Sequence, residues 1–272
     1  MDIIKKLAEE LNIGRHQAEA AVKLIDEGNT IPFIARYRKE ATGSLDDEVL
    51  RNLDERLKYL RNLEERKNQV IASIAEQEKL TPELERSIRD AQTLVAVEDL
   101  YRPYKPKRRT RAMIAKEKGL EPLADLISMQ MVKEPLLQAA AAYISQEKGV
   151  ETAEDAIQGA KDILAERISD NAEYRTYIRN ATMNKGVVQS SAKDEKAQSV
   201  YEMYYNYEEP VKKCAGHRIL ALNRGENEKI LTVKIAAPED QILMYLEKQT
   251  IVRDNPHTTP VLKEAAAEIG RA

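Results

Sequence analysis

Apolar residues recur every three or four positions in two short stretches at the start of the chain. The first stretch covers residues 3–11 and the second covers residues 18–25, and this spacing places apolar side chains on one face of a helix. Asn12, Ile13 and Gly14 lie between them and predict a break, because Asn and Gly favour turns. Two helices joined in this way have the spacing of a helix-turn-helix, which many helical hairpins share. Reading of DNA by this unit is one interpretation, and a plain hairpin is the other.

The next apolar segment, residues 31–39, combines aromatic and basic side chains and holds the only phenylalanine of the chain. We expect Phe33 and Ile34 to lie in the core. The cations of the segment should lie on the outside: Arg36, Arg38 and Lys39. The segment is therefore a second basic and aromatic cluster, in addition to the one described below.

A long helix is predicted after Gly43. Ser44 is the expected N-cap, and acids in the first turn complement the helix dipole. Apolar residues then keep a spacing of three or four up to about Glu76: Leu50, Leu53, Leu57, Leu60, Leu63, Val70, Ile71 and Ile74. The pattern predicts one helix of roughly 30 residues, which is about 45 Å long.

Shorter helices are predicted in the middle of the chain. Thr81 followed by Pro82 is a cap with proline at the first helical position, and residues 152–155 match a capping box. Ser169 and Asp170 are expected to cap a further helix. The other predicted helices of this part cover residues 113–118, 122–131 and 135–145.

The pattern changes toward the C-terminus. Residues 187–189 fit a short strand, and residues 191–205 fit a helix that ends in a run of tyrosines. Two runs rich in β-forming residues, 218–222 and 230–235, are separated by seven residues and are interpreted as a hairpin. Helices are predicted again at residues 238–249 and from Thr259 onward.

The chain is thus expected to be mainly α, a multi-helix scaffold with a helix-turn-helix-like unit, one long helix and a small β-hairpin near the C-terminus. Residues 1–112 would form an N-terminal helical region with the long helix and a basic connector. Residues 113–208 would form a second helical, helix-turn-helix or winged region. Residues 209–272 would form a small region of hairpin and helix that leads into further domains. A length of 272 residues suits one large or two to three small domains.

Composition agrees with long helices that carry stripes of charge. Hydrophobic residues make up 42% of the chain and charged residues 33%, and Gly and Pro are sparse at ten each. No run of about 18 apolar residues occurs, so we expect no membrane span. The N-terminus carries an early acid and lacks the apolar core of a secretory signal, so we expect a cytoplasmic protein.

One basic segment contrasts with the acidic balance of the chain. Residues 101–118 contain eight Lys and Arg and one acid, a charge of +7 in a chain of formal net charge −3. The first part, YRPYKPKRRTR at residues 101–111, holds two prolines, which lack a backbone donor and exclude a helix interior. We interpret residues 101–111 as a semi-extended connector between two helical blocks with an anionic partner. The alternative is a solvated loop whose cations pair with acids of neighbouring helices or pack on another domain.

Nucleic acid is the anionic partner that this connector suits, because Lys and Arg bind phosphate by charge neutralisation and counterion release. The candidate phosphate ligands are Arg102, Lys105, Lys107, Arg108, Arg109 and Arg111, together with Arg36, Arg38 and Lys39. Tyr101 and Tyr104 are candidates for stacking on unpaired bases. No base-specific reader is apparent, so RNA and DNA both remain open as partners and we expect low specificity.

No metal, cofactor or catalytic site is predicted. His16, His217 and His257 lie in unrelated segments without Cys or acid at metal-ligand spacing. Cys214 is the only cysteine and excludes a disulfide framework within the chain. The sequence has no phosphate-binding loop, dinucleotide fingerprint or nucleophile elbow. We expect a protein that is not an enzyme and needs no cofactor.

Four segments resemble the N-terminal half of the Tex family of bacterial transcription accessory proteins. They are IPFIARYRKEATGSLDD at residues 31–47, EDLYRPYKPKRRTRA at 98–112, KGLEPLADLI at 118–127 and HRILALNRGE at 217–226. The family is similar to a eukaryotic transcription elongation factor that also acts as a histone chaperone. The resemblance spans essentially the whole chain in order, and four long motifs together are highly specific.

This resemblance implies a helical scaffold with a helix-turn-helix region, around which later domains dock. In the family those domains are an RNase-H-like domain taken to be inactive, a helix-hairpin-helix unit and an OB-fold RNA-binding domain, and we expect this chain to lack them. Two functions follow as hypotheses. The connector contacts phosphate without sequence specificity, or the chain is a docking scaffold for those domains or for the transcription machinery. The sequence leaves the oligomeric state open.

Overall fold

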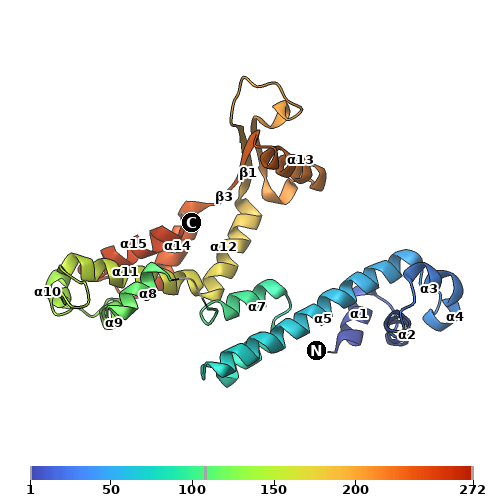
Figure 1. The fold of residues 1–272 in the computed structure, drawn as a ribbon, viewed down its shortest axis with the longest axis horizontal. Helices are drawn as coiled ribbons and strands as arrows, with labels where there is room; N and C mark the ends of the chain where they lie inside the picture. The colour runs from blue at the N-terminus through green and yellow to red at the C-terminus, as the bar shows by residue number, and fades with distance from the viewer. Residues whose placement is uncertain (1, 107–108, 271–272) are drawn as a thin grey trace. The chain divides into compact units, whose positions relative to one another are not determined.

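The computed structural model describes residues 2–106 and 109–270. The chain divides into two compact units, Met1–Tyr104 and Lys105–Ala272. In Figure 1 the colour of the first unit runs from blue into green and that of the second from green to red. Both units consist mainly of helices, as predicted, and a small sheet belongs to the second. Within the described ranges, no helix is both long and apolar enough to cross a membrane.

The helices of the first unit include those predicted before Asn12, before Gly28, after Gly43 and after Thr81. They are α1 (Ile3–Leu11), α2 (Arg15–Asp26), α3 (Ile31–Tyr37), α4 (Lys39–Thr42), α5 (Asp47–Glu76), α6 (Pro82–Asp90) and α7 (Leu94–Tyr101). The break between α1 and α2 falls where it is predicted, and α5 has 30 residues. The spacing of the predicted helix-turn-helix is therefore present, and its reading of DNA stays a prediction.

The start of α5 differs from the prediction by two residues. Ser44 does not cap the helix, because its backbone lies in the left-handed region with a φ of 64°. Asp46 is the N-cap instead, and its carboxylate accepts a hydrogen bond of 2.8 Å from the backbone N–H of Val49. An N-cap residue typically has an extended backbone. Gly43 and Ser44 form a turn in the left-handed region, and Asp46 is extended.

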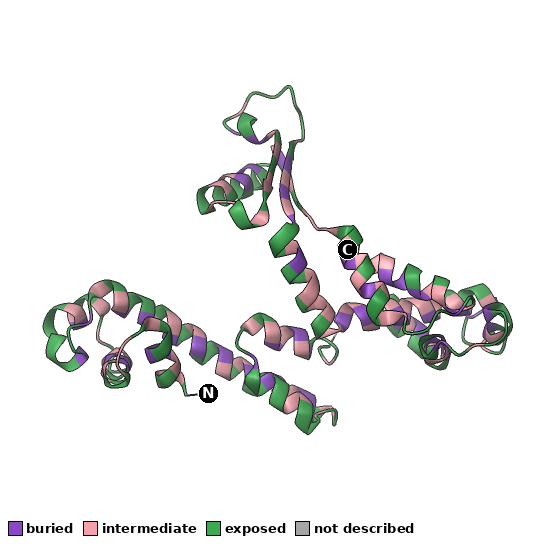
Figure 2. Cartoon of the chain, turned by 180° about the vertical axis from the view of Figure 1, so that it is seen from behind, coloured by how far each residue is buried: buried purple, intermediate pink, exposed green. Residues whose placement is uncertain are grey.

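One face of α5 contributes to two separate cores of the first unit. In its N-terminal half, leucines at positions 50, 53, 57 and 60 pack with α1, α2 and α3. In its C-terminal half, Leu63, Val70 and Ile74 pack with α6 and α7. Figure 2 shows the buried residues as a purple stripe along this helix. The stripe also includes the charged Lys67, whose residue surface is only 2% exposed.

The largest core of the second unit is built around α11 (Ala153–Asp170). Thr152 and Asp155 form the predicted capping box at its start. The other helices of this core are α8 (Arg111–Glu117), α9 (Glu121–Met129), α10 (Leu136–Ala141), α12 (Ala172–Lys185), α14 (Glu239–Thr250) and α15 (Thr259–Gly270). The cap of α12 is Asn171 rather than the predicted Ser169 and Asp170, because those two residues still belong to α11.

The sheet of the second unit has three antiparallel strands in the order β2-β1-β3. They are β1 (Val187–Ala192), β2 (Asn206–Pro210) and β3 (Leu231–Ala236). The predicted strand at residues 187–189 is confirmed as part of β1. The short helices η1 (Glu202–Tyr204) and η2 (Val211–Lys213) flank β2, and α13 (Gly216–Asn227) precedes β3.

Two predictions in this region are wrong. Residues 191–205 do not form a helix: they contain the end of β1, turns and η1. The predicted hairpin does not exist either, because residues 218–222 lie within α13 and β3 pairs with β1. A short apolar run does not distinguish a strand from a helix. Leu222 and Gly225 are buried from α13 beside Leu231, and this packing requires the helix.

Candidate nucleic-acid-binding surfaces

The basic connector begins with a tyrosine that is part of the core. Tyr101 is the last residue of α7 and is 8% exposed. Its hydroxyl lies 3.0 Å from the Ser73 hydroxyl, and the Arg66 guanidinium carbon lies 5.4 Å from its ring centroid. The Tyr101 ring therefore lies next to a cation and belongs to the hydrophobic core of α5, α6 and α7. This burial argues against the predicted stacking of Tyr101 on a base.

The residues that follow form turns at the end of the first unit and the start of the second. Arg102 and Lys105 are exposed, whereas Tyr104 is half-buried and packs against the core between α5, α6 and α7. The Tyr104 carbonyl accepts a hydrogen bond of 3.0 Å from the Gln77 amide. Lys107 and Arg108, both predicted phosphate ligands, lie outside the described residues.

Arg109 and Arg111 belong to the second unit and face carboxylates there. The Arg109 guanidinium lies 2.8 Å from the Glu117 carboxylate. Arg111 begins α8, and its guanidinium lies 3.9 Å from Asp162 and 3.7 Å from Glu268. Both side chains remain open to solvent, at 69% and 75% exposure. The pairing with helical acids that we considered as an alternative is therefore present, in an exposed form.

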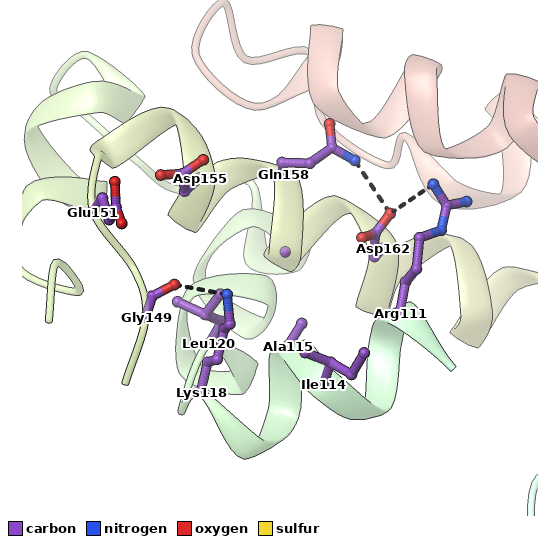
Figure 3. A pocket seen from close by; sticks show the side chains of 11 residues that line it. Arg111, Ile114, Ala115, Lys118, Leu120, Gly149, Glu151, Asp155, Gln158 and Asp162 are labelled. Carbon is purple, nitrogen blue, oxygen red and sulfur yellow. Dashed lines mark hydrogen bonds and ion pairs between the residues drawn. The ribbon is translucent and has the colours of Figure 1, made fainter. Parts of the chain in front are cut away.

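A pocket of about 440 Å³ opens beside Arg111, between α8 and α11 (Figure 3). The Asp162 carboxylate accepts a hydrogen bond of 3.1 Å from the Gln158 side-chain amide and faces the Arg111 guanidinium. Lys118 on the same side donates to the Gly149 carbonyl at 2.7 Å. The opposite wall also carries Glu151 and Asp155. An anion inside the pocket would face the carboxylates of Glu151, Asp155 and Asp162, whereas the Arg111 side chain is 75% exposed to solvent.

A second surface lies on α3 and α4 of the first unit. Arg36, Arg38 and Lys39 are exposed, as predicted. Ile34 is fully buried, which also confirms its predicted place in the core. Phe33, however, is only half-buried, and its expected core position is wrong. Its ring lies beside that of Tyr37, with centroids 5.3 Å apart and planes tilted by 47°.

Cations lie over these two rings. The Arg38 guanidinium carbon is 5.2 Å from the Phe33 centroid, and that of Arg36 is 6.0 Å from the Tyr37 centroid. Tyr37 is 61% exposed. Tyr37 is not among the predicted site residues, although it lies four residues after Phe33, a spacing that places both on one helix face. We call Phe33, Arg36, Tyr37, Arg38 and Lys39 the aromatic–basic platform.

Most other arginines of the first unit pair with acids at 2.5–3.0 Å. These arginines are Arg15, Arg51, Arg56, Arg61, Arg66 and Arg89. The hydrogen bonds from Arg56 and Arg61 hold the pKa values of Glu10 and Asp26 below their ordinary values. Across the described residues, no ion pair joins a cation of the platform to a carboxylate. The platform cations thus differ from these six arginines, each of which pairs with an acid.

Two family models match the chain. The model described as Tex-like protein N-terminal domain matches residues 1–75. The model described as Tex central region-like matches residues 133–259. The first range includes the platform, and the second includes the sheet together with α11 to α14.

Similar proteins occur in bacteria and animals. Uncharacterized protein YdcI of Bacillus subtilis (strain 168) is 49% identical over 263 residues, which cover 96% of this chain and 37% of the relative. Transcriptional accessory protein Tex of Neisseria gonorrhoeae is 43% identical over 242 residues, or 88% of this chain and 32% of the relative. S1 RNA-binding domain-containing protein 1 of Homo sapiens is 31% identical over 244 residues, or 86% of this chain and 24% of the relative.

The chain thus spans between about a quarter and just over a third of the length of these relatives. The matched models are those of the N-terminal domain and the central region, and they contain the first and the last of the four motifs, at residues 31–47 and 217–226. The chain belongs to the Tex family.

Proposed function

We propose that the chain serves a Tex-like transcription accessory factor by contacting the phosphate groups of RNA or DNA without sequence preference. The observation that carries this proposal is the exposure of Arg109 and Arg111 on the connector, at 69% and 75%. The name of the Neisseria gonorrhoeae relative assigns it to transcription, and that of the human relative includes RNA binding. We extend both ideas to the connector of this chain.

The ion pairs of these arginines do not prevent phosphate binding. Exposed pairs of this kind contribute roughly 0–1 kcal/mol, because water and salt screen the charges. A guanidinium bound to phosphate makes charge-assisted, bidentate hydrogen bonds and releases counterions from the nucleic acid. Exchange of a carboxylate such as Glu117 for phosphate is therefore favourable where several phosphates are available on one backbone.

The double variant Arg109→Gln, Arg111→Gln tests this proposal. Each lost phosphate contact lowers the slope of log affinity against log salt by about 0.9 for duplex DNA and about 0.7 for a single strand. We therefore expect the slope to flatten by about 1.8 or about 1.4, and affinity to fall for every sequence tested. The measurement is fluorescence anisotropy of labelled RNA and DNA at a series of salt concentrations.

A matched control is Lys133→Gln, Lys248→Gln, which removes the same charge from two other exposed positions of the second unit. Equal effects of both double variants would show that only net charge matters and that the connector is not a binding surface. Unchanged affinity and an unchanged slope for the arginine variant would contradict phosphate contact by these two residues.

A second candidate function is docking of protein domains, favoured by the acids that surround Arg111. In that case Arg109 and Arg111 pair with Glu117, Asp162 and Glu268 of this same unit. These pairs would hold its docking surface in shape. The arginine variant would then keep its affinity for nucleic acid and unfold at a lower temperature. A thermal melt beside the anisotropy measurement separates the two functions.

We also propose that the chain acts without catalysis. Purified protein should not hydrolyse RNA, DNA or nucleoside triphosphates when Mg²⁺ or Mn²⁺ is added, because no group of three or more metal-ligating side chains forms among the described residues. Product analysis across the fractions of a sizing column is the measurement. Turnover that follows the protein peak and depends on metal would overturn the proposal.

A further inference from the structure

We propose that the aromatic–basic platform of α3 and α4 is a binding site for single-stranded nucleic acid, in which an unpaired base stacks on Tyr37. This inference rests on the proposed association with nucleic acid and adds the class of strand and a second contact surface. Arg36, Arg38 and Lys39 would neutralise the phosphates on either side of the stacked base.

Helix geometry explains why the two aromatic rings face outward. Ile31, Ile34 and Ala35 follow the spacing of one helix face and pack into the core of α1, α2 and α5. At 100° per residue, Phe33 and Tyr37 lie on the opposite side of α3. Their positions are therefore fixed by the same pattern that buries Ile34.

Aromatic rings normally lie in the core, because burial of a large ring contributes strongly to stability. The only phenylalanine of this chain is half-buried beside a tyrosine that is 61% exposed. Surface aromatic rings with adjacent cations are typical of single-strand sites, where bases stack on the rings and the backbone contacts Lys and Arg.

The cations are available for such contacts. The guanidinium carbons of Arg38 and Arg36 lie over the rings of Phe33 and Tyr37, at 5.2 and 6.0 Å from the ring centroids. Cation–π contacts hold a guanidinium near an aromatic face and leave its N–H donors free for phosphate. The nearest acid in sequence is Glu40, which is exposed, and no ion pair from it to the platform occurs in the part of the chain that the structure describes.

The helices that carry the platform are attached to the core of the first unit. Thr42 is fully buried at the end of α4. The Gln17 side-chain amide of α2 donates hydrogen bonds of 3.1 Å to the carbonyl oxygens of Thr42 and Gly43. Ile34 anchors the other end of the platform in the core. A rigid support of this kind reduces the entropy that is lost when a ligand binds.

A single strand fits these features better than a duplex or an acidic peptide. Bases in a duplex are stacked on each other and cannot reach Tyr37 without being unpaired. An acidic peptide would bind the three cations but gains little from an exposed tyrosine ring. The expected ligand is therefore an unpaired segment of RNA or DNA, with little preference among bases because every base has a face that stacks.

The test uses the absence of tryptophan from the chain. Tyr37→Trp places one tryptophan on the platform, and stacking of a base should quench its fluorescence when oligouridine is added. Met244→Trp is the matched control, since Met244 is exposed to 73% on α14 of the second unit. We expect quenching by the single strand at Tyr37→Trp and little change at Met244→Trp or with a duplex of the same length.

Affinity measurements complete the test. Tyr37→Leu should weaken binding of oligouridine about tenfold, which corresponds to the loss of one stacked base, and Tyr37→Phe should retain binding within about twofold. Arg86→Ala removes an exposed cation of the same unit that lies off the platform, and it should have little effect.

The outcomes separate this inference from the proposed function. One outcome is that oligouridine binding is weakened by the connector variant Arg109→Gln, Arg111→Gln but not by Tyr37→Leu. In that case the proposed function stands and the platform is not a stacking site. If no nucleic acid binds the protein, both fail. Equal quenching at Tyr37→Trp by an acidic peptide such as polyglutamate would overturn the inference in favour of a protein partner.

Discussion

Lys67→Ala should destabilise the first unit by about 3 kcal/mol, because it removes a buried ammonium together with the two hydrogen bonds that it donates. The Lys67 ammonium donates to the Glu64 carboxylate at 2.8 Å and to the Arg89 carbonyl at 2.7 Å. Arg89 lies in the last turn of α6, whose carbonyl groups have no partner within the helix. Lys67 therefore joins α5 to α6 from within the core.

Lys67→Met separates the charge from the packing, since it keeps most of the apolar stem. We expect it to cost less than alanine, about 1–2 kcal/mol for the lost hydrogen bonds. Lys58→Ala is the control, because Lys58 is 73% exposed in its pair with Asp54. The measurement is chemical unfolding with hydrogen exchange of the α6 amides, because a chain of two units need not unfold in one step. A loss at Lys67→Ala no larger than that at Lys58→Ala would contradict a stabilising role.

The effect of Lys67 should depend on pH through Glu64. Burial raises the pKa of Glu64, but the hydrogen bond from Lys67 helps to bring it below the ordinary value of 4.5. A carboxyl group with a lowered pKa stabilises the fold above its unfolded pKa, and this contribution is lost as pH falls. The difference in free energy of unfolding between Lys67→Met and the unchanged protein should therefore become smaller below about pH 4.5.

Asn255→Ala should destabilise the second unit by about 2–4 kcal/mol, through the loss of hydrogen bonds at a buried loop. The Asn255 side-chain amide donates to the carbonyl oxygens of Gln130 and Val132 at 3.2 and 2.8 Å. Its side-chain oxygen accepts from the backbone N–H of His257 at 2.9 Å. These bonds connect the loop after α9 to the loop between α14 and α15. Thermal unfolding followed by circular dichroism is the measurement.

Asn255→Asp sharpens this prediction because it keeps the shape of the side chain. The carboxylate still accepts from His257, but it cannot donate to the two carbonyl oxygens and repels them. The loss of stability caused by Asn255→Asp at neutral pH should therefore equal or exceed the loss caused by Asn255→Ala. Asn223→Ala, at an exposed position of α13, should change stability little. Tolerance of aspartate at position 255 would show that the loop is not held by these donors.

Much of the fold follows from local pattern. The apolar spacing predicts α5 with its full length, the capping box at Thr152 identifies the start of α11, and Thr81 with Pro82 does the same for α6. These signals are local because a helix satisfies its backbone hydrogen bonds within one segment and needs only one apolar face to be buried. The four motifs of the sequence also predict the Tex family, which the two family models confirm.

The candidate surfaces were predicted less completely. The exposure of Arg36, Arg38 and Lys39 follows from their charge. The outward position of Phe33 does not, because hydrophobicity alone favours burial of a phenylalanine. The helical spacing of Ile31, Ile34 and Ala35 does exclude Phe33 from the core face, so the spacing predicts the position of Phe33 better than its hydrophobicity does. For Arg109 and Arg111, the sequence predicts a charge but does not identify the acid that each one faces.

By itself, the sequence determined the helical class of this protein, the positions of most helices and the basic character of its connector. Each of these depends on residues within a few turns of one another. Only the tertiary structure decided that residues 218–222 form part of α13, that β1 is the central strand and that Lys67 lies in a core. The physical reason is that the burial of a short apolar run, or of a single charge, is stabilised by contacts with residues that are distant in the sequence. Leu231 supports the helix at Gly225, and the Arg89 carbonyl accepts the buried ammonium of Lys67.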